Sequence, residues 1–423
     1  MRWLWVALAV AGCTTTSGGK GGGEPVTLYE NGRVWTGDGF VPRMLAVSGG
    51  RFVDPRGAGR DAARVDLGGR WVVPAYGNAH AHITDPTPAA STRYLKDGVL
   101  YVWNPNTVTL SVEAKAFFAR PDTYDVKIAQ GGITEPGGHP ERLYVDYLTR
   151  YVYKGRDRAW FVGNAFHYGS TPAEIDAALD RLRGQGADFV KAYLLHSKDW
   201  ERRRGDASFY GQRGLDPRNM RHLVRAARKR GLWVAAHLDT AADLRVAAAA
   251  GVAVAAHVPG YHSRSGEEGE AKVTLTDEDA RAVVRAGMKL VPTYALAAGE
   301  LAAEPGKPAP DSALRRRVFE RQRGNMQRLK QAGATLLMGT DTWGPIFEEA
   351  EHWVTIGAFT PDEATRIVLG TGALLFPERR IGCFRAGCEA DFLVLGGDPT
   401  RDVKALRLIT DRVKAGRRIP VAP

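Results

Sequence analysis

Cysteine is scarce in this chain, with only Cys13, Cys383 and Cys388 among 423 residues. No two of them have the spacing of a zinc ribbon, so the sequence excludes a structural zinc site built from cysteine thiolates. Cys383 and Cys388 flank residues 384–387, whose Phe-Arg-Ala-Gly sequence suits a hairpin turn. We therefore hypothesise a cross-strand disulfide between these two cysteines, which an oxidising compartment would permit.

The apolar run near the N-terminus, residues 3–11, is too short to span a bilayer as a helix. Because it follows the positive Met1-Arg2 pair, it has the pattern of a secretory signal. Residues 10–13 (Val-Ala-Gly-Cys) resemble a bacterial lipobox, in which Cys13 is the lipidated first residue of the mature protein. The alternative is an ordinary signal peptide with a chance cysteine.

These features predict an exported protein that is lipid-anchored to a bacterial membrane and faces the periplasm or the exterior. Residues 1–13 would be the lipoprotein signal peptide. Residues 14–24, rich in Thr, Ser and Gly, would be a flexible tether.

Clusters of positive charge are also lacking, although the net charge is +11. The densest cluster, residues 201–204 (Glu-Arg-Arg-Arg), is short and contains an acid. This dispersion argues against a nucleic-acid partner. Mild attraction to an anionic membrane surface is the better interpretation of the charge.

The central part of the chain alternates short apolar runs with helix-patterned stretches, which is typical of βα units and a parallel sheet. The predicted helices include residues 219–229, 242–250 and 313–331, and Thr276 and Thr360 look like N-caps of two more. The eight apolar runs are residues 71–74, 99–103, 126–129, 189–194, 233–237, 252–257, 290–293 and 335–338. We therefore predict an α/β fold with a (β/α)8 TIM barrel, with an excursion at residues 122–160.

Both ends of the chain have a different sequence pattern, in which short segments of alternating apolar residues are separated by glycine-rich turns. We expect residues 25–70 and 377–423 to join into one small composite β-sandwich domain. The barrel would then comprise residues 71–376.

Polar residues follow or interrupt five of the apolar runs, at the strand ends where barrel enzymes build their sites. They are His80, His82, Lys191, His237, His257 and Asp341. Two histidines at i and i+2 on a strand point to the same face and can chelate a divalent metal. All six side chains are potential ligands of hard or borderline divalent ions.

Lys191 is unusual because it lies inside an apolar strand, where burial of an ammonium group costs several kcal/mol. Desolvation and nearby cations lower the pKa of such an amine and leave it neutral. A neutral amine can take up carbon dioxide and form a carbamate, which can bridge two metals. The alternative is a lysine that reaches solvent or pairs with an acid.

The ordered set of motifs resembles the amidohydrolase superfamily of binuclear metal hydrolases, close to its dipeptidase-like and imidazolonepropionase-like branches. The resemblance is carried by residues 69–74 leading to His80 and His82, 186–191 (Gly-Ala-Asp-Phe-Val-Lys), 236–237, 256–257, 339–341 and 390–395. Two departures are Ala75, where the family usually has Gly, and Asn78, where it usually has Asp. Since position 78 is not a ligand, we expect altered hydrogen bonds around the site and no loss of metal.

The resemblance implies that His80, His82 and Asp341 hold a first divalent metal, with zinc as the expected ion. His237 and His257 would hold a second, and Lys191, carboxylated by carbon dioxide, would bridge the two. The metal pair would acidify a shared water into a bridging hydroxide that attacks the substrate carbonyl. Asp341 would act as the general acid and base.

Three further residues are predicted to contact substrate: His139, Tyr193 and Tyr294. His139 is glycine-flanked like pocket histidines of related enzymes, Tyr193 shares a strand face with Lys191, and Tyr294 follows the seventh run. Surface or helix positions are the default for the remaining histidines, which are His167, His196, His222, His262 and His352.

The leading hypothesis is an exported hydrolase of amide bonds in dipeptides or small cyclic amides. A mononuclear deaminase of the same superfamily is disfavoured, because such enzymes carry Glu where Thr240 follows His237. A lactone or organophosphate hydrolase stays open, and so does a non-catalytic binding lipoprotein. The oligomeric state is open too, with a homo-oligomer among the options.

Overall fold

The computed structural model describes residues 24–82, 86–118, 120–263, 269–302, 311–342 and 344–420. The predicted signal peptide, Cys13 and the tether up to residue 23 lie outside these ranges. Within them, no helix combines the length and apolar character needed to cross a membrane.

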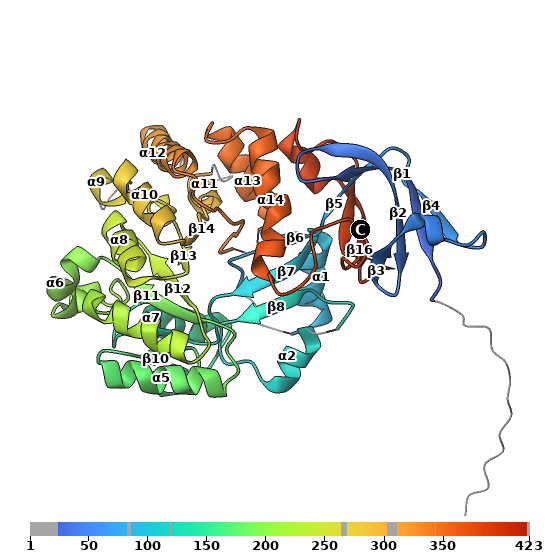
Figure 1. Ribbon diagram of the computed structural model, residues 1–423. Coiled ribbons are helices and arrows are strands. Elements are labelled where there is room, and N and C mark those ends of the chain that lie inside the picture. Colours follow the sequence, from blue (N-terminus) through green and yellow to red (C-terminus); the bar gives the residue numbers. More distant parts are fainter. Residues whose placement is uncertain are drawn as a thin grey trace, which may run out of the picture.

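Segments from both ends of the chain form one eight-stranded sheet, in the order β17-β16-β15-β5-β1-β2-β3 with β4 beside β1. Figure 1 shows the blue N-terminal and red C-terminal strands side by side. The strands are β1 (Thr27–Trp35), β2 (Phe40–Ser48), β3 (Arg51–Val53), β4 (Ala63–Asp66), β5 (Trp71–Pro74), β15 (Phe392–Leu395), β16 (Ile409–Lys414) and β17 (Arg417–Arg418). Phe392 packs against Tyr29 and Phe52 in its core, at ring distances of 5.1 and 5.8 Å. The two ends therefore join as predicted; their arrangement as a sandwich with the predicted domain limits stays a prediction.

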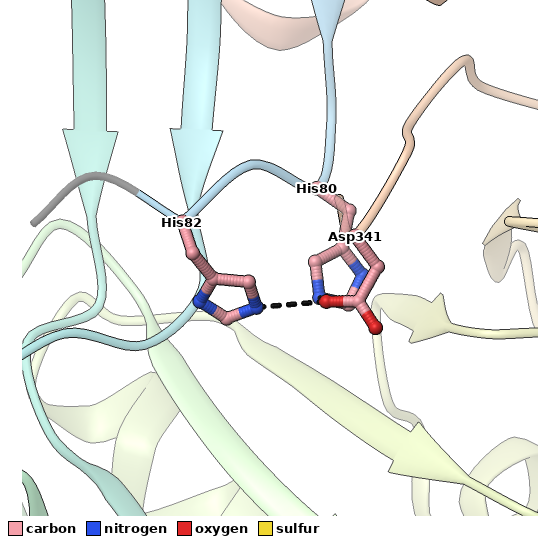
Figure 2. Close-up of side chains that lie close together, drawn as sticks. All are labelled: His80, His82 and Asp341. Atoms are coloured by element: carbon pink, nitrogen blue, oxygen red, sulfur yellow. Dashed lines mark hydrogen bonds and ion pairs between the residues drawn. The ribbon is translucent and has the colours of Figure 1, made fainter. Parts of the chain in front are cut away.

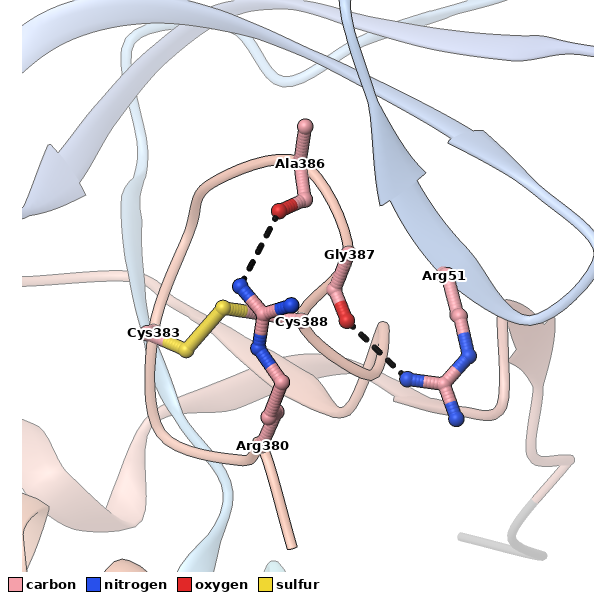
Figure 3. Close-up of a disulfide and its surroundings, with 6 residues drawn as sticks. All are labelled: Arg51, Arg380, Cys383, Ala386, Gly387 and Cys388. Carbon is pink, nitrogen blue, oxygen red and sulfur yellow. Dashed lines mark hydrogen bonds between the residues drawn. A yellow bond between two sulfur atoms is a disulfide. The ribbon is translucent and has the colours of Figure 1, made fainter.

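Cys383 and Cys388 form the hypothesised disulfide, with Cα atoms 6.0 Å apart. The bond closes a loop and does not cross two strands, which corrects the expected hairpin. This loop packs on β3: Arg51 donates to the Gly387 carbonyl, and Arg380 donates to the Ala386 carbonyl within the loop (Figure 3). The disulfide thus fixes a loop that covers the edge of the terminal sheet.

Two parallel sheets occupy the middle of the chain. One has the order β6-β7-β8 and the other β10-β9-β11-β12-β13-β14. Their strands are β6 (Tyr76–Asn78), β7 (Val99–Asn104), β8 (Asp125–Ile128), β9 (Gly132–Thr134), β10 (Phe166–Tyr168), β11 (Val190–Leu194), β12 (Val234–Leu238), β13 (Val254–Ala256) and β14 (Lys289–Val291). The Asp188 N–H donates to the Ile128 carbonyl at 2.8 Å and so links the two sheets.

The first and last predicted barrel strands need correction. Residues 71–74 form β5, which pairs with β15 and β1 in the terminal sheet, so β6 is the first strand of the parallel sheets. In the last run, residues 335–338, only Leu336 forms a bridge, with Leu290. The Met338 N–H donates to the Thr371 hydroxyl on α14 instead of to a neighbouring strand. The Ala79 N–H still donates to the Met338 carbonyl at 2.7 Å, so this run lies beside the end of β6.

Helices cover the outside of the parallel sheets (Figure 1). They are α1 (Pro88–Lys96), α2 (Val112–Phe118), α5 (Pro172–Gly184), α6 (Trp200–Arg204), α7 (Met220–Lys229), α8 (Ala241–Ala250), α9 (Glu270–Val273), α10 (Asp277–Arg285), α11 (Ala295–Glu300), α12 (Ser312–Gln331), α13 (Ile346–Thr355) and α14 (Pro361–Leu375). The three helices predicted outright correspond to α7, α8 and α12. Thr276 and Thr360 cap α10 and α14 with complete capping boxes, as predicted.

The expected excursion at residues 122–160 contains β8, β9, a π-helical turn (Leu143–Leu148), α3 (Thr149–Tyr151) and α4 (Arg158–Phe161). Tyr144, in the π-helical turn, packs in a small buried cluster with Phe161 and Phe166. The Tyr144 hydroxyl donates to the Asn106 side chain at 2.7 Å. These contacts anchor the segment beside the ends of the parallel strands.

Candidate metal centre

His80 and His82 follow β6 and are fixed by hydrogen bonds from both sides. The Asn78 side chain accepts from the His80 N–H at 3.0 Å and donates to the Thr340 hydroxyl at 3.1 Å. The Nδ1 atom of His82 donates to the Asn106 carbonyl at 2.8 Å. Asn78, which departs from the family pattern, therefore ties the His80 backbone to the segment that carries Asp341.

Asp341 reaches these histidines because the chain approaches His80 very closely at Gly339. A Cβ at position 339 would lie 2.3 Å from Val291 and 2.9 Å from the His80 nitrogen, so only glycine fits. The Asp341 N–H donates to the His80 carbonyl at 2.9 Å, and Asp341 has a left-handed φ of 53°. Backbone strain of this kind concentrates at functional sites.

The Asp341 carboxylate lies against His80, and the His82 imidazole contacts it from the side (Figure 2). Its Oδ1 atom is 3.1 Å from Nε2 of His80 and 2.9 Å from Nε2 of His82. Its Oδ2 atom is 3.7 Å from Nε2 of His257. Three of the predicted ligands thus face one carboxylate.

The other predicted ligands line the same cavity. The ring centre of His257 is 4.7 Å from that of His80 and 4.6 Å from that of His237. Lys191 is 1% exposed on β11, beside β12, which carries His237. Gly132 on β9 leaves room for Tyr193 and Lys191, since a Cβ there would lie 2.4 Å from the Tyr193 ring and 3.3 Å from Lys191. The structure therefore brings all six predicted ligand side chains to one place.

Burial lowers the pKa of three of these groups, which are His80, His257 and Lys191. It lowers the pKa of His80 to about 3, and that of His257 well below its usual range, against the opposing effect of Asp341. Burial likewise lowers the pKa of Lys191 to about 7. Burial would raise the pKa of Asp341, but His80 and His82 outweigh it and hold that pKa well below the usual range. Neutral imidazoles beside an ionised carboxylate are the states in which these groups bind metal.

The hydrogen bonds of His82 and His257 test whether a metal fits. The Asn106 carbonyl can only accept, so in a neutral His82 the proton is on Nδ1 and the Nε2 atom, 2.9 Å from Asp341, is free to bind a metal. Nδ1 of His257 is 2.8 Å from the Thr293 hydroxyl, which itself donates to the Pro292 carbonyl, so Nε2 of His257 also presents a lone pair. A divalent ion between these lone pairs and the carboxylate would satisfy both. The ligand atoms of His80, His82 and Asp341 lie within 4.8 Å of one another, which suits one divalent ion.

Two adjoining cavities, which share lining residues, open over these residues. The inner one has a volume of about 420 Å³ and is lined by the six predicted ligands and by a wall of Leu143, Leu148, Tyr153 and Leu296. The outer one, of about 1330 Å³, shares Leu143 and His237 with it and extends past Arg142, Arg150 and Arg203.

The predicted substrate contacts have different outcomes. His139 stacks on His237 at 4.8 Å and meets Tyr193 edge-on at 5.1 Å, and both side chains line the inner cavity. Burial lowers the pKa of His139 to about 3. Tyr294 lies outside both cavities, because its buried hydroxyl donates to the Pro259 carbonyl at 3.0 Å. Thr293 before it has a left-handed φ of 56°, which turns the Tyr294 side chain away from the site.

Sequence reasoning missed the residues around His237. Asp239 and Tyr261 are buried beside it, and both line the outer cavity together with His196 and His262. The surface-or-helix default is therefore wrong for His196 and His262. It is also wrong for His167, which is buried on β10, whereas His222 and His352 do lie on α7 and α13. The available signal was the position of Asp239, one residue past the end of β12 and two residues after His237.

Comparisons with known proteins identify the family through one family model and the fold through solved structures. The model of the amidohydrolase family matches residues 201–417, about half of the chain, which includes His237, His257 and Asp341. Ochratoxinase from A. niger is 19% identical with a TM-score of 0.70, over 95% of this chain and 97% of that one. A prolidase complexed with N-methylphosphonate-L-proline is 17% identical with a TM-score of 0.71, over 94% and 100%. Molinate hydrolase is 17% identical with a TM-score of 0.69, over 95% and 97%. At these identities the likeness shows the fold alone, and no curated protein matches the sequence.

Proposed function

The chain belongs to the amidohydrolase family, whose members hydrolyse C–N bonds, and we propose that it is a binuclear metal-dependent hydrolase of dipeptides or small cyclic amides. The observation that carries this proposal is the convergence of four histidines, one lysine and one aspartate on the inner cavity. A non-catalytic binding lipoprotein would have no need of this complete set.

Each side chain has a distinct task in this proposal. His80, His82 and Asp341 would hold the first ion, and His237 and His257 the second. Lys191, buried and only weakly stabilised as a cation, would bridge the ions as its carbamate. When bound, two such ions, expected to be zinc, acidify a water molecule and polarise an amide carbonyl.

Asp341 would act as the general base and then as the general acid. Its oxygens lie at the centre of the histidine set, so as a carboxylate it can take a proton from water and deliver it to the leaving amine. His139 and Tyr193, which line the inner cavity beside His237, would orient the substrate. The chain thus supplies its own base, and the ions would activate the water and the amide carbonyl.

The proposal also includes the barrel architecture of the protein and its export from the cytoplasm. The two parallel sheets, linked through Asp188 and Ile128 and through Ala79 and Met338, would be parts of one (β/α)8 barrel. A disulfide between Cys383 and Cys388 is favoured in an oxidising compartment and supports export, with Cys13 as the lipid-bearing residue.

The direct test is a screen of the zinc-loaded mature protein against dipeptides, cyclic amides, aminated heterocycles, lactones and phosphotriesters. We expect about two zinc ions per chain by elemental analysis and release of free amino acids from dipeptides or ring-opened product from cyclic amides. Release of ammonia alone would indicate the deaminase, and turnover only of the esters would indicate the other hydrolase class. A protein that binds these compounds without turnover would overturn the proposal.

The apolar wall of the inner cavity predicts a preference for substrates with apolar side chains. Leu148→Ala removes part of this wall, and we expect kcat/KM for leucine-sized substrates to fall about tenfold, since a few buried methylenes are worth 1–3 kcal/mol. For substrates with small side chains, kcat/KM should change little. Steady-state kinetics on matched dipeptides check this, with the exposed Leu408→Ala as control. An equal fall for every substrate would count against a specificity role.

A further inference from the structure

Asp239 is a buried carboxylate that no step above uses. It is 8% exposed and lies just beyond β12, two residues after His237. Its Oδ1 atom accepts from Nε2 of His237 at 3.1 Å and from the Tyr261 hydroxyl at 3.1 Å. Its Oδ2 atom is 3.4 Å from Nε2 of His196. One carboxylate thus gathers three side chains from three separate segments.

Tyr261 extends this contact to the other proposed ligand of the second ion. Its ring stacks on that of His257, with centres 4.1 Å apart and planes inclined by 15°. The same ring meets His237 edge-on at 5.9 Å. Asp239 therefore holds His237 directly and His257 through Tyr261.

The turn that carries Asp239 is itself fixed. Asp243, fully buried in the first turn of α8, accepts from the Asp239 N–H at 3.2 Å and from the Thr240 N–H at 2.8 Å. It also accepts from the His196 N–H at 3.0 Å. The capping box of Thr240 and Asp243 therefore sets the position of the carboxylate before any ligand binds.

The bond to Asp239 decides which nitrogen of His237 is left to bind a metal. A carboxylate only accepts, so Nε2 of His237 has the proton and Nδ1 keeps the lone pair. His82 and His257 have the opposite arrangement, since their Nδ1 atoms donate and their Nε2 atoms keep the lone pair. Partners of this kind fix both the tautomer and the ring orientation of metal-binding histidines.

We infer that Asp239 and Tyr261 are positioning residues that select His237 as an Nδ1 ligand and hold the His257 ring beside it. The inference rests on the proposed binuclear function, because it concerns the second of the two ions. It assigns the pair no contact with substrate during the reaction.

Chelator-competition titration of the apo protein with Zn²⁺ tests this inference without an activity assay. For Asp239→Asn we expect the affinity of the weaker-binding ion to fall by about 10- to 100-fold, while the other ion is bound as before. Tyr261→Phe keeps the ring and loses only the hydroxyl, so the affinity for this ion should fall less than in Asp239→Asn. The matched control is Asp391→Asn, since Asp391 is also buried and accepts a tyrosine hydroxyl, from Tyr101 in the region of the terminal sheet.

Nitrogen-15 NMR of labelled histidine gives an independent readout. His237 should be protonated at Nε2 in the folded apo protein and should lose this preference in Asp239→Asn, even if that variant is less stable. Unchanged affinities together with an unchanged tautomer would overturn the inference. A wild-type protein that binds no second ion would instead overturn the proposed binuclear function, so the two failures are distinguishable.

Discussion

Lys191→Ala should bind fewer than two zinc ions per chain and lose activity by at least roughly 10³-fold, because the metal pair contributes several kcal/mol of transition-state stabilisation. Elemental analysis of the purified variant and kinetics on the best dipeptide would measure both effects. The loss should be visible in kcat and in metal content together.

The physical reason is charge. Without the carbamate, two divalent cations would be held by four neutral or weakly basic imidazoles and by Asp341 alone, so their mutual repulsion would be poorly offset. Lys191 is buried where an ammonium group is disfavoured and makes no ion pair among those found in the described chain. A salt bridge therefore does not explain this lysine, whereas the proposed carbamate would.

Two variants separate this role from a purely structural one. Lys191→Met keeps the length of the side chain and should fold with unchanged stability while losing activity equally. Lys414→Met removes a buried lysine from β16, where Asp125 keeps its partner Arg379, and should keep both ions. Added formate or acetate should restore part of the activity of Lys191→Ala by filling the space with a carboxylate. Full activity of Lys191→Ala would contradict the bridging role.

The ligand set could be predicted from the sequence because strand ends of parallel sheets meet at one edge. His80, His237 and His257 each follow or end an apolar run, and that local pattern was enough to bring them together. Lys191 stood out by a single physical conflict, a charged side chain in a buried strand. The roles of these residues remain predictions.

Other features depend on partners that the local sequence does not reveal. Residues 71–74 have the apolar pattern of a buried strand in either sheet, and only pairing with β15, far away in the sequence, assigns them to the terminal one. Tyr294 was misplaced because the left-handed Thr293 interrupts the alternation of side chains. Asp239 was missed because its partners Tyr261 and His196 come from other loops.

Asp341→Asn should largely retain metal and lose turnover by about 10²- to 10⁴-fold, the range that a positioned general acid and base contributes. Asparagine has the same shape, so the close approach at Gly339 and the N–H bond to the His80 carbonyl are kept. Its carbonyl oxygen can still face His80 and His82, but an amide cannot take up a proton at neutral pH.

Metal content and kcat, measured on the same preparation, distinguish the two tasks of Asp341. If zinc is lost in parallel with activity, Asp341 acts chiefly as a ligand, and another group must move the proton. If zinc stays and kcat falls, the carboxylate is the base, since only its capacity to accept a proton has changed. The matched control is Asp411→Asn, because Asp411 is a similarly buried carboxylate between Arg70 and Arg418 in the terminal sheet. Normal turnover of Asp341→Asn would show that the proton moves without this carboxylate, and His139, which stacks on His237 and lines the inner cavity, would then be the next group to substitute.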